Sequence, residues 1–147
     1  MPNKIHKPKY FHIIILMLLI SITLSACPSI PPAEHIIDTT WRWTEVVETE
    51  PASQSIVPNP EKYTLLLSSD GTVSMLADCN MVSGSSIFDD YDLTIELGPS
   101  TMAYCGEESL DLLYLGFISS VESFNVVDGR LVLDLKGGAG RMTFTRE

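Results

Sequence analysis

The chain has 147 residues, of which 45% are hydrophobic and 19% charged, and its formal net charge is −10. This length and composition allow one globular domain and little more. The excess of acidic residues makes nucleic acid and anionic surfaces poor partners, because either would have to be bound against a field of the same sign.

The first 26 residues have the pattern of a secretion signal. Lys4, Lys7 and Lys9 form a basic start, and an uncharged apolar run from Ile13 to Leu24 follows them. A membrane-spanning helix needs about 20 apolar residues, and this run is shorter. The sequence therefore predicts a cleaved signal peptide over residues 1–26 rather than a retained transmembrane anchor.

A cysteine follows the signal directly. The segment Leu24-Ser25-Ala26-Cys27 matches the bacterial lipobox, in which a branched and two small residues precede the cysteine that is lipidated. We expect cleavage before Cys27 and stable anchoring by its acyl chains. Cleavage leaves 19 acidic and six basic residues, a net charge of −13. The predicted location is the cell envelope, and Pro28 resembles sorting signals for the periplasmic face of the outer membrane in a Gram-negative host.

Two cysteines remain after lipidation, Cys79 and Cys105. Delivery to an oxidising compartment favours a disulfide between them. Closing this loop would contribute about 3 kcal/mol in the chain-entropy estimate. Two buried free thiols are the alternative, because the sequence gives no distance between the two side chains.

Residues 27–39 are predicted to be the lipidated cysteine and a proline-rich, semi-extended tether. A folded domain is predicted over residues 40–147. It begins with a half-buried strand from Thr40 to Val46, whose alternation places Trp41 and Trp43 on the core face. The segment from Glu48 to Glu61, with three prolines, is predicted to be a loop.

Alternating apolar residues predict further strands and hairpins. The pair Asp70-Gly71 is the turn of a hairpin over residues 62–77, and Asp128-Gly129 is the turn of a second. The remaining predicted strands are residues 83–88, residues 93–97 ended by Gly98-Pro99, and residues 141–145 after a glycine-rich hairpin loop.

One amphipathic helix is predicted after Cys105. Glu107 and Glu108 suit the positive end of a helix dipole in its first turn. Apolar residues recur at helical spacing after them and predict a face that packs on the sheet. This predicted face consists of Leu110, Leu113, Tyr114, Phe117 and Val121.

The residues that could carry catalysis or bind a metal are few. His35 is the one histidine after Cys27, and it lies in the tether, which excludes a Ser-His-Asp or Cys-His site inside the domain. His35, Cys79 and Cys105 are too few for a zinc site. The acidic turn at 89–92 lacks the glycine and terminal glutamate of a calcium loop and is interpreted as a solvated turn. No metal or other cofactor is predicted, and paired carboxylates stay open as a catalytic alternative.

The arrangement from about Thr40 to Arg146 resembles the META domain family. The resemblance depends on a Cys-Asn pair, a glycine four residues after the Asn, and a Thr-x-x-x-Cys motif; here these are Cys79, Asn80, Gly84, Thr101 and Cys105. Two positions depart from the family pattern, since Asp78 replaces a glycine and Ser86 replaces an aromatic residue. A ligand of other members need not be shared by this chain.

The resemblance implies an α+β fold that is mainly antiparallel β, a small sheet or open barrel with one helix. It implies no catalytic residues, and several members are envelope lipoproteins or periplasmic proteins associated with stress. The sequence thus predicts an anchored lipoprotein with a non-catalytic domain that binds an envelope protein, a peptide or a lipid. The alternative is an enzyme or protease-inhibitor-like protein acting on envelope substrates. A cleft with perturbed carboxylates would favour an enzyme, and an exposed apolar patch or uncovered sheet edge would favour a binding module.

Overall fold

The structure is a computed structural model that describes residues 32–147. The predicted signal peptide over residues 1–26 and the predicted lipidation site Cys27 lie outside the described residues. Both stay predictions.

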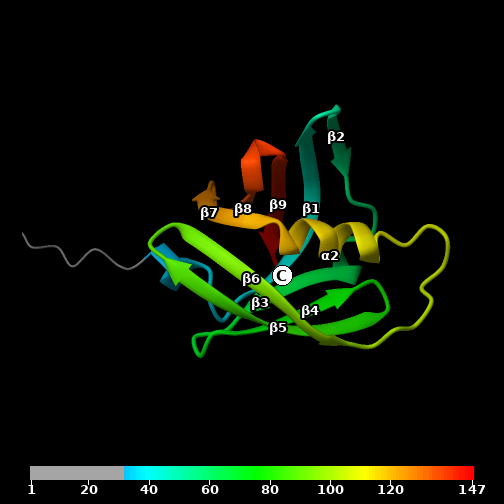
Figure 1. The fold of residues 1–147 in the computed structure, drawn as a ribbon, viewed down its shortest axis with the longest axis horizontal. Helices are drawn as coiled ribbons and strands as arrows, with labels where there is room; N and C mark the ends of the chain where they lie inside the picture. The colour runs from blue at the N-terminus through cyan, green and yellow to red at the C-terminus, as the bar shows by residue number, and fades with distance from the viewer. Residues whose placement is uncertain (1–31) are drawn as a thin grey trace, which may run out of the picture. The chain divides into compact units, whose positions relative to one another are not determined.

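Within residues 32–147, antiparallel strands form one sheet that closes into a barrel (Figure 1). The ring consists of β1 and β3 to β9 in chain order, and β9 pairs with β1 to close it. β2 lies outside the ring and pairs with β1 alone. The predicted α+β fold is therefore confirmed, as a closed barrel with one helix. The strands are β1 (Thr40–Thr49), β2 (Ala52–Ile56), β3 (Tyr63–Leu67), β4 (Thr72–Ala77), β5 (Asn80–Asp89), β6 (Asp92–Ser100), β7 (Val121–Val127), β8 (Arg130–Leu135) and β9 (Gly140–Arg146).

The barrel has a weak seam between β6 and β7. Asp92 and Ser123 are the one residue pair that joins these two strands. The helix α2 (Asp111–Ser119) belongs to the connection between them and contacts β6 and β4 (Figure 1). Its Tyr114 and Ile118 are fully buried. The helix therefore covers the gap that the diverging strands leave.

Aromatic side chains fill the core beneath this helix. Trp41 and Trp43 are both fully buried, as their alternation predicted. The Trp43 ring lies 5.8 Å from that of Tyr63 and 5.4 Å from that of Tyr114. The Tyr114 hydroxyl donates to the Thr64 carbonyl at 2.9 Å, and burial raises the pKa of this phenol. Each large ring thus contributes apolar area to the core, and the buried hydroxyl has a partner.

Two predicted boundaries are wrong: those of the loop over residues 48–61 and the end of the strand over residues 93–97. The predicted loop over residues 48–61 contains the end of β1 and all of β2, which form a hairpin. Most residues of β2 are exposed, so the strand has no buried stripe that its sequence could reveal. β6 continues through Gly98-Pro99 to Ser100. Pro99 is tolerated because β6 is an edge there, beyond its single pair with β7.

The helix begins later than predicted. α2 starts at Asp111, so Glu107 and Glu108 belong to the preceding loop and not to a first helical turn. Gly106 has a φ of +102°, in the left-handed region, and it begins this loop instead of a helix.

The buried face of α2 also differs from the predicted stripe. Leu113 is 46% exposed, and Val121 lies in β7. The fully buried pair is Tyr114 and Ile118, one helical turn apart, while Phe117 is half-buried with its ring 6.2 Å from that of Trp43. The helix has nine residues and buries a narrow face. The predicted stripe, from residue 110 to residue 121, is longer than this helix.

Part of the predicted tether packs on the barrel. A 3-10 turn, η2, spans Pro32–His35, and the following Ile36 is fully buried. The Trp41 indole N–H donates to the Ile36 carbonyl at 2.9 Å, and the Asp38 N–H donates to the Leu67 carbonyl at 2.7 Å. The folded unit therefore includes residues before Thr40. None of the helices in residues 32–147 is both long and apolar enough to cross a membrane.

Two leucine-sized residues on α2 test the observed packing. We expect Ile118→Ala to lower the free energy of unfolding by about 2 to 5 kcal/mol, because the side chain is fully buried and its loss leaves a cavity. Leu112→Ala, at an 82% exposed position of the same helix, is expected to change it by less than about 0.5 kcal/mol. Urea unfolding measures both values. Equal losses from the two variants would contradict the assigned helix face.

Candidate functional site

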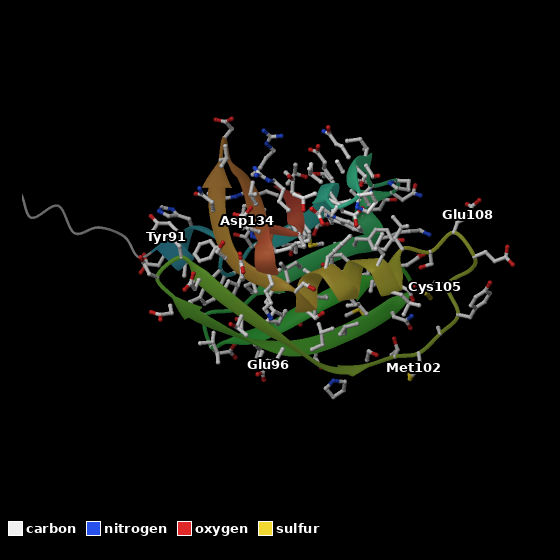
Figure 2. The ribbon with its side chains drawn as sticks, turned by 45° about the horizontal axis from the view of Figure 1, so that its top comes forward. Tyr91, Glu96, Met102, Cys105, Glu108 and Asp134 are labelled. Carbon is white, nitrogen blue, oxygen red and sulfur yellow. A yellow bond between two sulfur atoms is a disulfide. The ribbon has the colours of Figure 1, made fainter. Side chains whose placement is uncertain are left out.

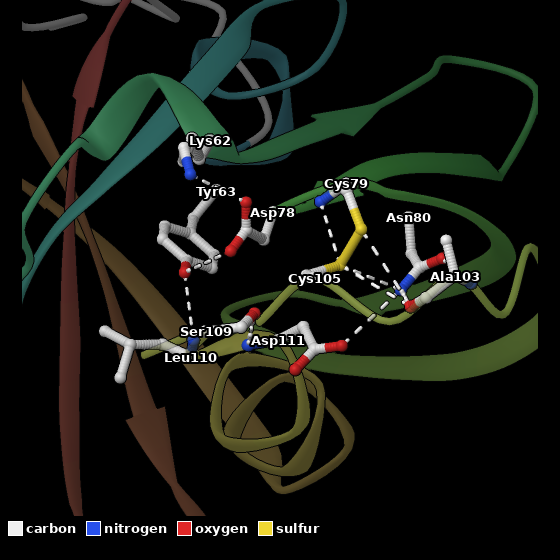
Figure 3. Close-up of polar contacts among 10 residues, drawn as sticks. All are labelled: Lys62, Tyr63, Asp78, Cys79, Asn80, Ala103, Cys105, Ser109, Leu110 and Asp111. Carbon is white, nitrogen blue, oxygen red and sulfur yellow. Dashed lines mark hydrogen bonds and ion pairs between the residues drawn. A yellow bond between two sulfur atoms is a disulfide. The ribbon is translucent and has the colours of Figure 1, made fainter. Parts of the chain in front are cut away.

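The residues of the predicted family motif meet at one end of the barrel. Cys79 lies in the turn between β4 and β5, Asn80 is the first residue of β5, and the segment 101–105 leaves the end of β6 (Figure 3). A disulfide joins Cys79 and Cys105, with their Cα atoms 5.6 Å apart. This separation is normal for a disulfide. The bond predicted from the cysteine count is present.

The side-chain amide of Asn80 holds the segment 101–105 by hydrogen bonds. Its Oδ1 accepts hydrogen bonds from the Ala103 N–H at 2.7 Å and from the Thr101 hydroxyl at 3.1 Å. Its Nδ2 donates to the Ala103 carbonyl at 3.0 Å. The side chain therefore pairs with the backbone of Ala103 on both sides, as a neighbouring strand would. Asn80 is buried, so this pairing satisfies groups that water does not reach.

Thr101 and Gly84 complete this connection. The Met81 N–H donates to the Thr101 Oγ1 at 2.9 Å, and the Thr101 N–H donates to the Met81 carbonyl at 3.0 Å. At Gly84, a side chain would collide with the Glu96 carbonyl oxygen on β6. Glycine is needed there because the two strands approach closely. We call Cys79, Asn80, Thr101 and Cys105 the clamp, since together they fix the segment 101–105 on β5.

A polar cluster beside the clamp was not predicted. The Lys62 ammonium lies 3.0 Å from Asp78 Oδ1, and the Asp78 side chain is 8% exposed. The hydrogen bond from Lys62 lowers the pKa of Asp78, and Asp78 in turn raises the pKa of Lys62. The Tyr63 hydroxyl accepts the Leu110 N–H at 2.9 Å and lies 3.5 Å from Asp78 Oδ2. This cluster connects β3 and β4 to the start of α2.

The hairpin register could have revealed the ion pair. Tyr63 pairs with Ala77 across β3 and β4, so the next residues outward, Lys62 and Asp78, face each other. The sequence contains this signal once Asp70-Gly71 is taken as the turn. Asp78 also has a φ of +55°, in the left-handed region. Aspartate is among the few side chains that tolerate this conformation, which a glycine adopts without strain.

A cleft of about 350 Å³ opens next to the cluster. It lies between the start of β3 and the loop that follows Cys105. Its lining combines one ammonium with three carboxylates, a tyrosine ring and backbone. In the part of the chain that the structure describes, no three His, Cys, Asp or Glu side chains are grouped to hold a metal ion. The lining residues are Pro58, Asn59, Lys62, Tyr63, Asp78, Cys105, Gly106, Glu107, Glu108 and Ser109.

The clamped segment and the helix start carry exposed apolar side chains. Met102 is 94% exposed and Tyr104 is 81% exposed, on a segment whose backbone is fixed by the clamp. Leu112 and Leu113 are exposed on the first turn of α2. Figure 2 shows Met102 and Glu108 on the outside of this loop. We call the exposed Met102 and Tyr104 side chains the apolar loop surface; sequence analysis missed them because an irregular loop carries no periodic pattern.

The family model of the META domain matches residues 34–147. The chain belongs to the META domain family. The match includes the last two residues of η2, Glu34 and His35, and the buried Ile36, which agrees with the packing of this segment on the barrel. In this META domain the motif residues Cys79, Asn80, Gly84, Thr101 and Cys105 all hold strands and loops together, and the two departures are local. Asp78 keeps the left-handed turn, and Ser86 is buried on β5.

Solved structures share the META fold at low sequence identity. An NMR structure of a protein from Burkholderia xenovorans has a TM-score of 0.64 and 21% identity, and the match covers 100% of this chain and 99% of that chain. A DUF4847 family protein from Bacteroides vulgatus, in a crystal structure, has a TM-score of 0.58 and 11% identity, with 77% and 95% covered. These likenesses concern the fold alone. A search of curated proteins finds no match.

The clamp predicts a large effect at Asn80. We expect Asn80→Ala to lower the free energy of unfolding by about 3 kcal/mol, because it removes the hydrogen bonds of a buried amide to the Ala103 N–H, the Ala103 carbonyl and the Thr101 hydroxyl. Asn125→Ala is the matched control, since the exposed Asn125 amide accepts only from the adjacent Val126 N–H, and less than about 0.5 kcal/mol is expected. Denaturant unfolding of both variants checks this. A loss below 1 kcal/mol at Asn80 would show that the clamp contributes little, given that typical hydrogen bonds contribute about 1 kcal/mol each.

The ion pair predicts a pH-dependent effect at Asp78. Its pKa is lowered in the folded state, so its contribution to stability is present above the unfolded value of about 3.9 and is lost as the pH falls through the folded value. Asp78→Asn keeps a residue that tolerates the left-handed turn and removes the charge. We expect this variant to be less stable than the parent at pH 7 and equally stable at the acid end. Urea midpoints measured from pH 7 downward test this; a difference that does not change with pH would contradict it.

Proposed function

We propose that this META domain protein is a lipid-anchored, non-catalytic binding protein of the cell envelope. We propose further that it binds a protein partner through the apolar loop surface. The observation that carries the proposal is that the clamp immobilises a backbone segment whose Met102 and Tyr104 side chains point into solvent.

The exposed side chains are better explained by binding than by folding. Met102, Tyr104 and Leu112 are each more than four-fifths exposed, so they add little to the core. A disulfide and a buried amide nevertheless hold the segment in one conformation. Ordering a loop before it meets its partner lowers the entropy cost of binding. Tyrosine and methionine are also enriched in protein interfaces.

Charge and position favour a protein over a lipid as the partner. Glu107 and Glu108 are exposed in the same loop, and Asp111 begins the helix beside it. The partner should therefore offer an apolar pocket bordered by Lys or Arg. In Figures 1 and 2 this loop lies at the end of the domain opposite η2, where the chain enters it. The loop therefore lies far from the first described residues of the chain.

Two features favour a binding module, namely exposed apolar side chains and an uncovered sheet edge, and both are present. The apolar loop surface is the first. The second is β2, which pairs with β1 along one edge and has no strand on the other within residues 32–147. The enzyme alternative would use the cleft beside Lys62. Its most buried carboxylate, Asp78, already pairs with Lys62, and its lowered pKa keeps it anionic, which does not suit a general acid.

Site-specific photocrosslinking in intact cells tests the partner. A photoreactive residue in place of Tyr104 is expected to give a discrete protein adduct. The matched control is Ile87, which is 63% exposed on β5 and outside the apolar loop surface, and no adduct is expected there. A lipid adduct at Tyr104, or equal adducts at both positions, would overturn the proposed protein partner.

Metabolic labelling with a fatty-acid analogue tests the anchor separately. The full chain should take up the label, and Cys27→Ser should lose it, because the thiol of Cys27 is the proposed acceptor. Cys79→Ala and Cys105→Ala together should keep the label. Retained labelling after Cys27→Ser would contradict lipidation at this residue and would leave the crosslinking result unaffected.

A further inference from the structure

We propose that the Cys79–Cys105 disulfide is a directional thiol–disulfide exchange site, in which an incoming thiolate attacks Cys79 and Cys105 is the leaving group. The substrate class is a thiol or dithiol reductant of the envelope. This inference goes beyond the proposed binding function and does not depend on it.

Access favours attack at Cys79. Cys79 lies exposed in the turn between β4 and β5, whereas Cys105 is half-buried in the loop that follows β6. A thiolate must approach a disulfide sulfur from the side opposite the bond that breaks, so the attacked sulfur has to be open to solvent. The exposed cysteine meets this condition better than its partner.

Hydrogen bonding favours Cys105 as the leaving thiolate. Its Sγ accepts the Cys79 N–H at 3.3 Å and the Asn80 Nδ2–H at 3.3 Å. Both donors would strengthen their bonds to a sulfur that becomes negatively charged. Among the described residues, the one polar atom next to Cys79 Sγ is the Ala103 carbonyl oxygen, at 3.9 Å, which would oppose a negative charge. The same oxygen lies 3.6 Å from Cys105, where the two N–H groups offset it.

Asp111 opposes this stabilisation. Asn80 Nδ2 carries two hydrogens and has three acceptors within reach, namely the Ala103 carbonyl, Cys105 Sγ and, at 3.5 Å, Asp111 Oδ2. The carboxylate competes for the hydrogen that the leaving sulfur needs. It also adds a negative charge near that sulfur. Asp111 therefore gives the site a means of slowing exchange, and removing its charge should speed exchange.

The exchange balances in two steps. The reductant thiolate forms a new S–S bond with Cys79 Sγ as the Cys79–Cys105 bond breaks, and the electron pair leaves on Cys105. A second thiol of the reductant then attacks the reductant's own sulfur in the mixed disulfide and releases Cys79, which takes up a proton. The dithiol reductant is oxidised to a disulfide and the cysteine pair is reduced by two electrons.

Trapping the mixed disulfide tests the direction of attack. The full chain is solubilised from membranes, any free Cys27 thiol is alkylated, and reduced glutathione is added for a short time before quenching with a maleimide. Peptide mass spectrometry then locates the glutathione. We expect it on Cys79 in at least roughly tenfold excess over Cys105, the ratio that a difference of about 1.4 kcal/mol between the two routes would give. Equal labelling, or an excess on Cys105, would overturn the proposal.

Rates of reduction provide a second measurement. Asp111→Asn should speed reduction by glutathione severalfold, because it replaces the competing carboxylate with a weaker, neutral acceptor and removes a charge near the leaving sulfur. Asp134→Asn, which removes an exposed carboxylate on β8, is the control for net charge and should leave the rate unchanged. Circular dichroism of both variants confirms that the fold is kept. Equal rates for the two variants would overturn the role of the hydrogen bonds.

Discussion

The amide of Asn80 is the interaction on which this end of the molecule depends. It offers the backbone of Ala103 a donor and an acceptor in the place where a sheet would put another strand. A segment that has left the ladder of β6 is thereby kept in a fixed conformation beside β5. The disulfide fixes the same segment covalently at Cys105. The loop that follows is held at both ends, since the Leu110 N–H donates to Tyr63 at the start of α2.

This arrangement gives every residue of the family motif a structural role. Each motif residue satisfies a backbone group, closes a covalent link or makes room for a neighbouring strand. The exposed side chains that the fixed segment presents are not part of the motif. In this chain these are Met102 and Tyr104, which the motif places but does not specify. Loops held on a rigid scaffold often carry binding residues, because the scaffold fixes where their side chains lie.

The sequence predicted the parts of the fold where one face is buried and the turn chemistry is specific. Trp41 and Trp43 alternate into the core, and Asp70-Gly71 lies at the turn of the hairpin. β2 was missed because its residues are mostly exposed and carry no periodic signal. The helix face was misassigned because several leucines share helical spacing, and only the packing of Tyr114 and Ile118 against the barrel decides between them. The role of Asn80 depends on backbone atoms of residue 103, whose position no local pattern encodes.

Closure of the barrel has a consequence for how the chain can fold. β1 pairs with β9 across almost the whole domain, and the Thr44 hydroxyl donates to the Thr143 carbonyl, 99 residues away in sequence. Contacts of such long sequence separation form slowly, because much of the chain must be ordered first. Until β9 emerges, β1 and β8 present unpaired edges that can join another chain. During synthesis, β1 therefore lacks its β9 partner until the end of the chain is made, and its free edge is open to aggregation during that interval.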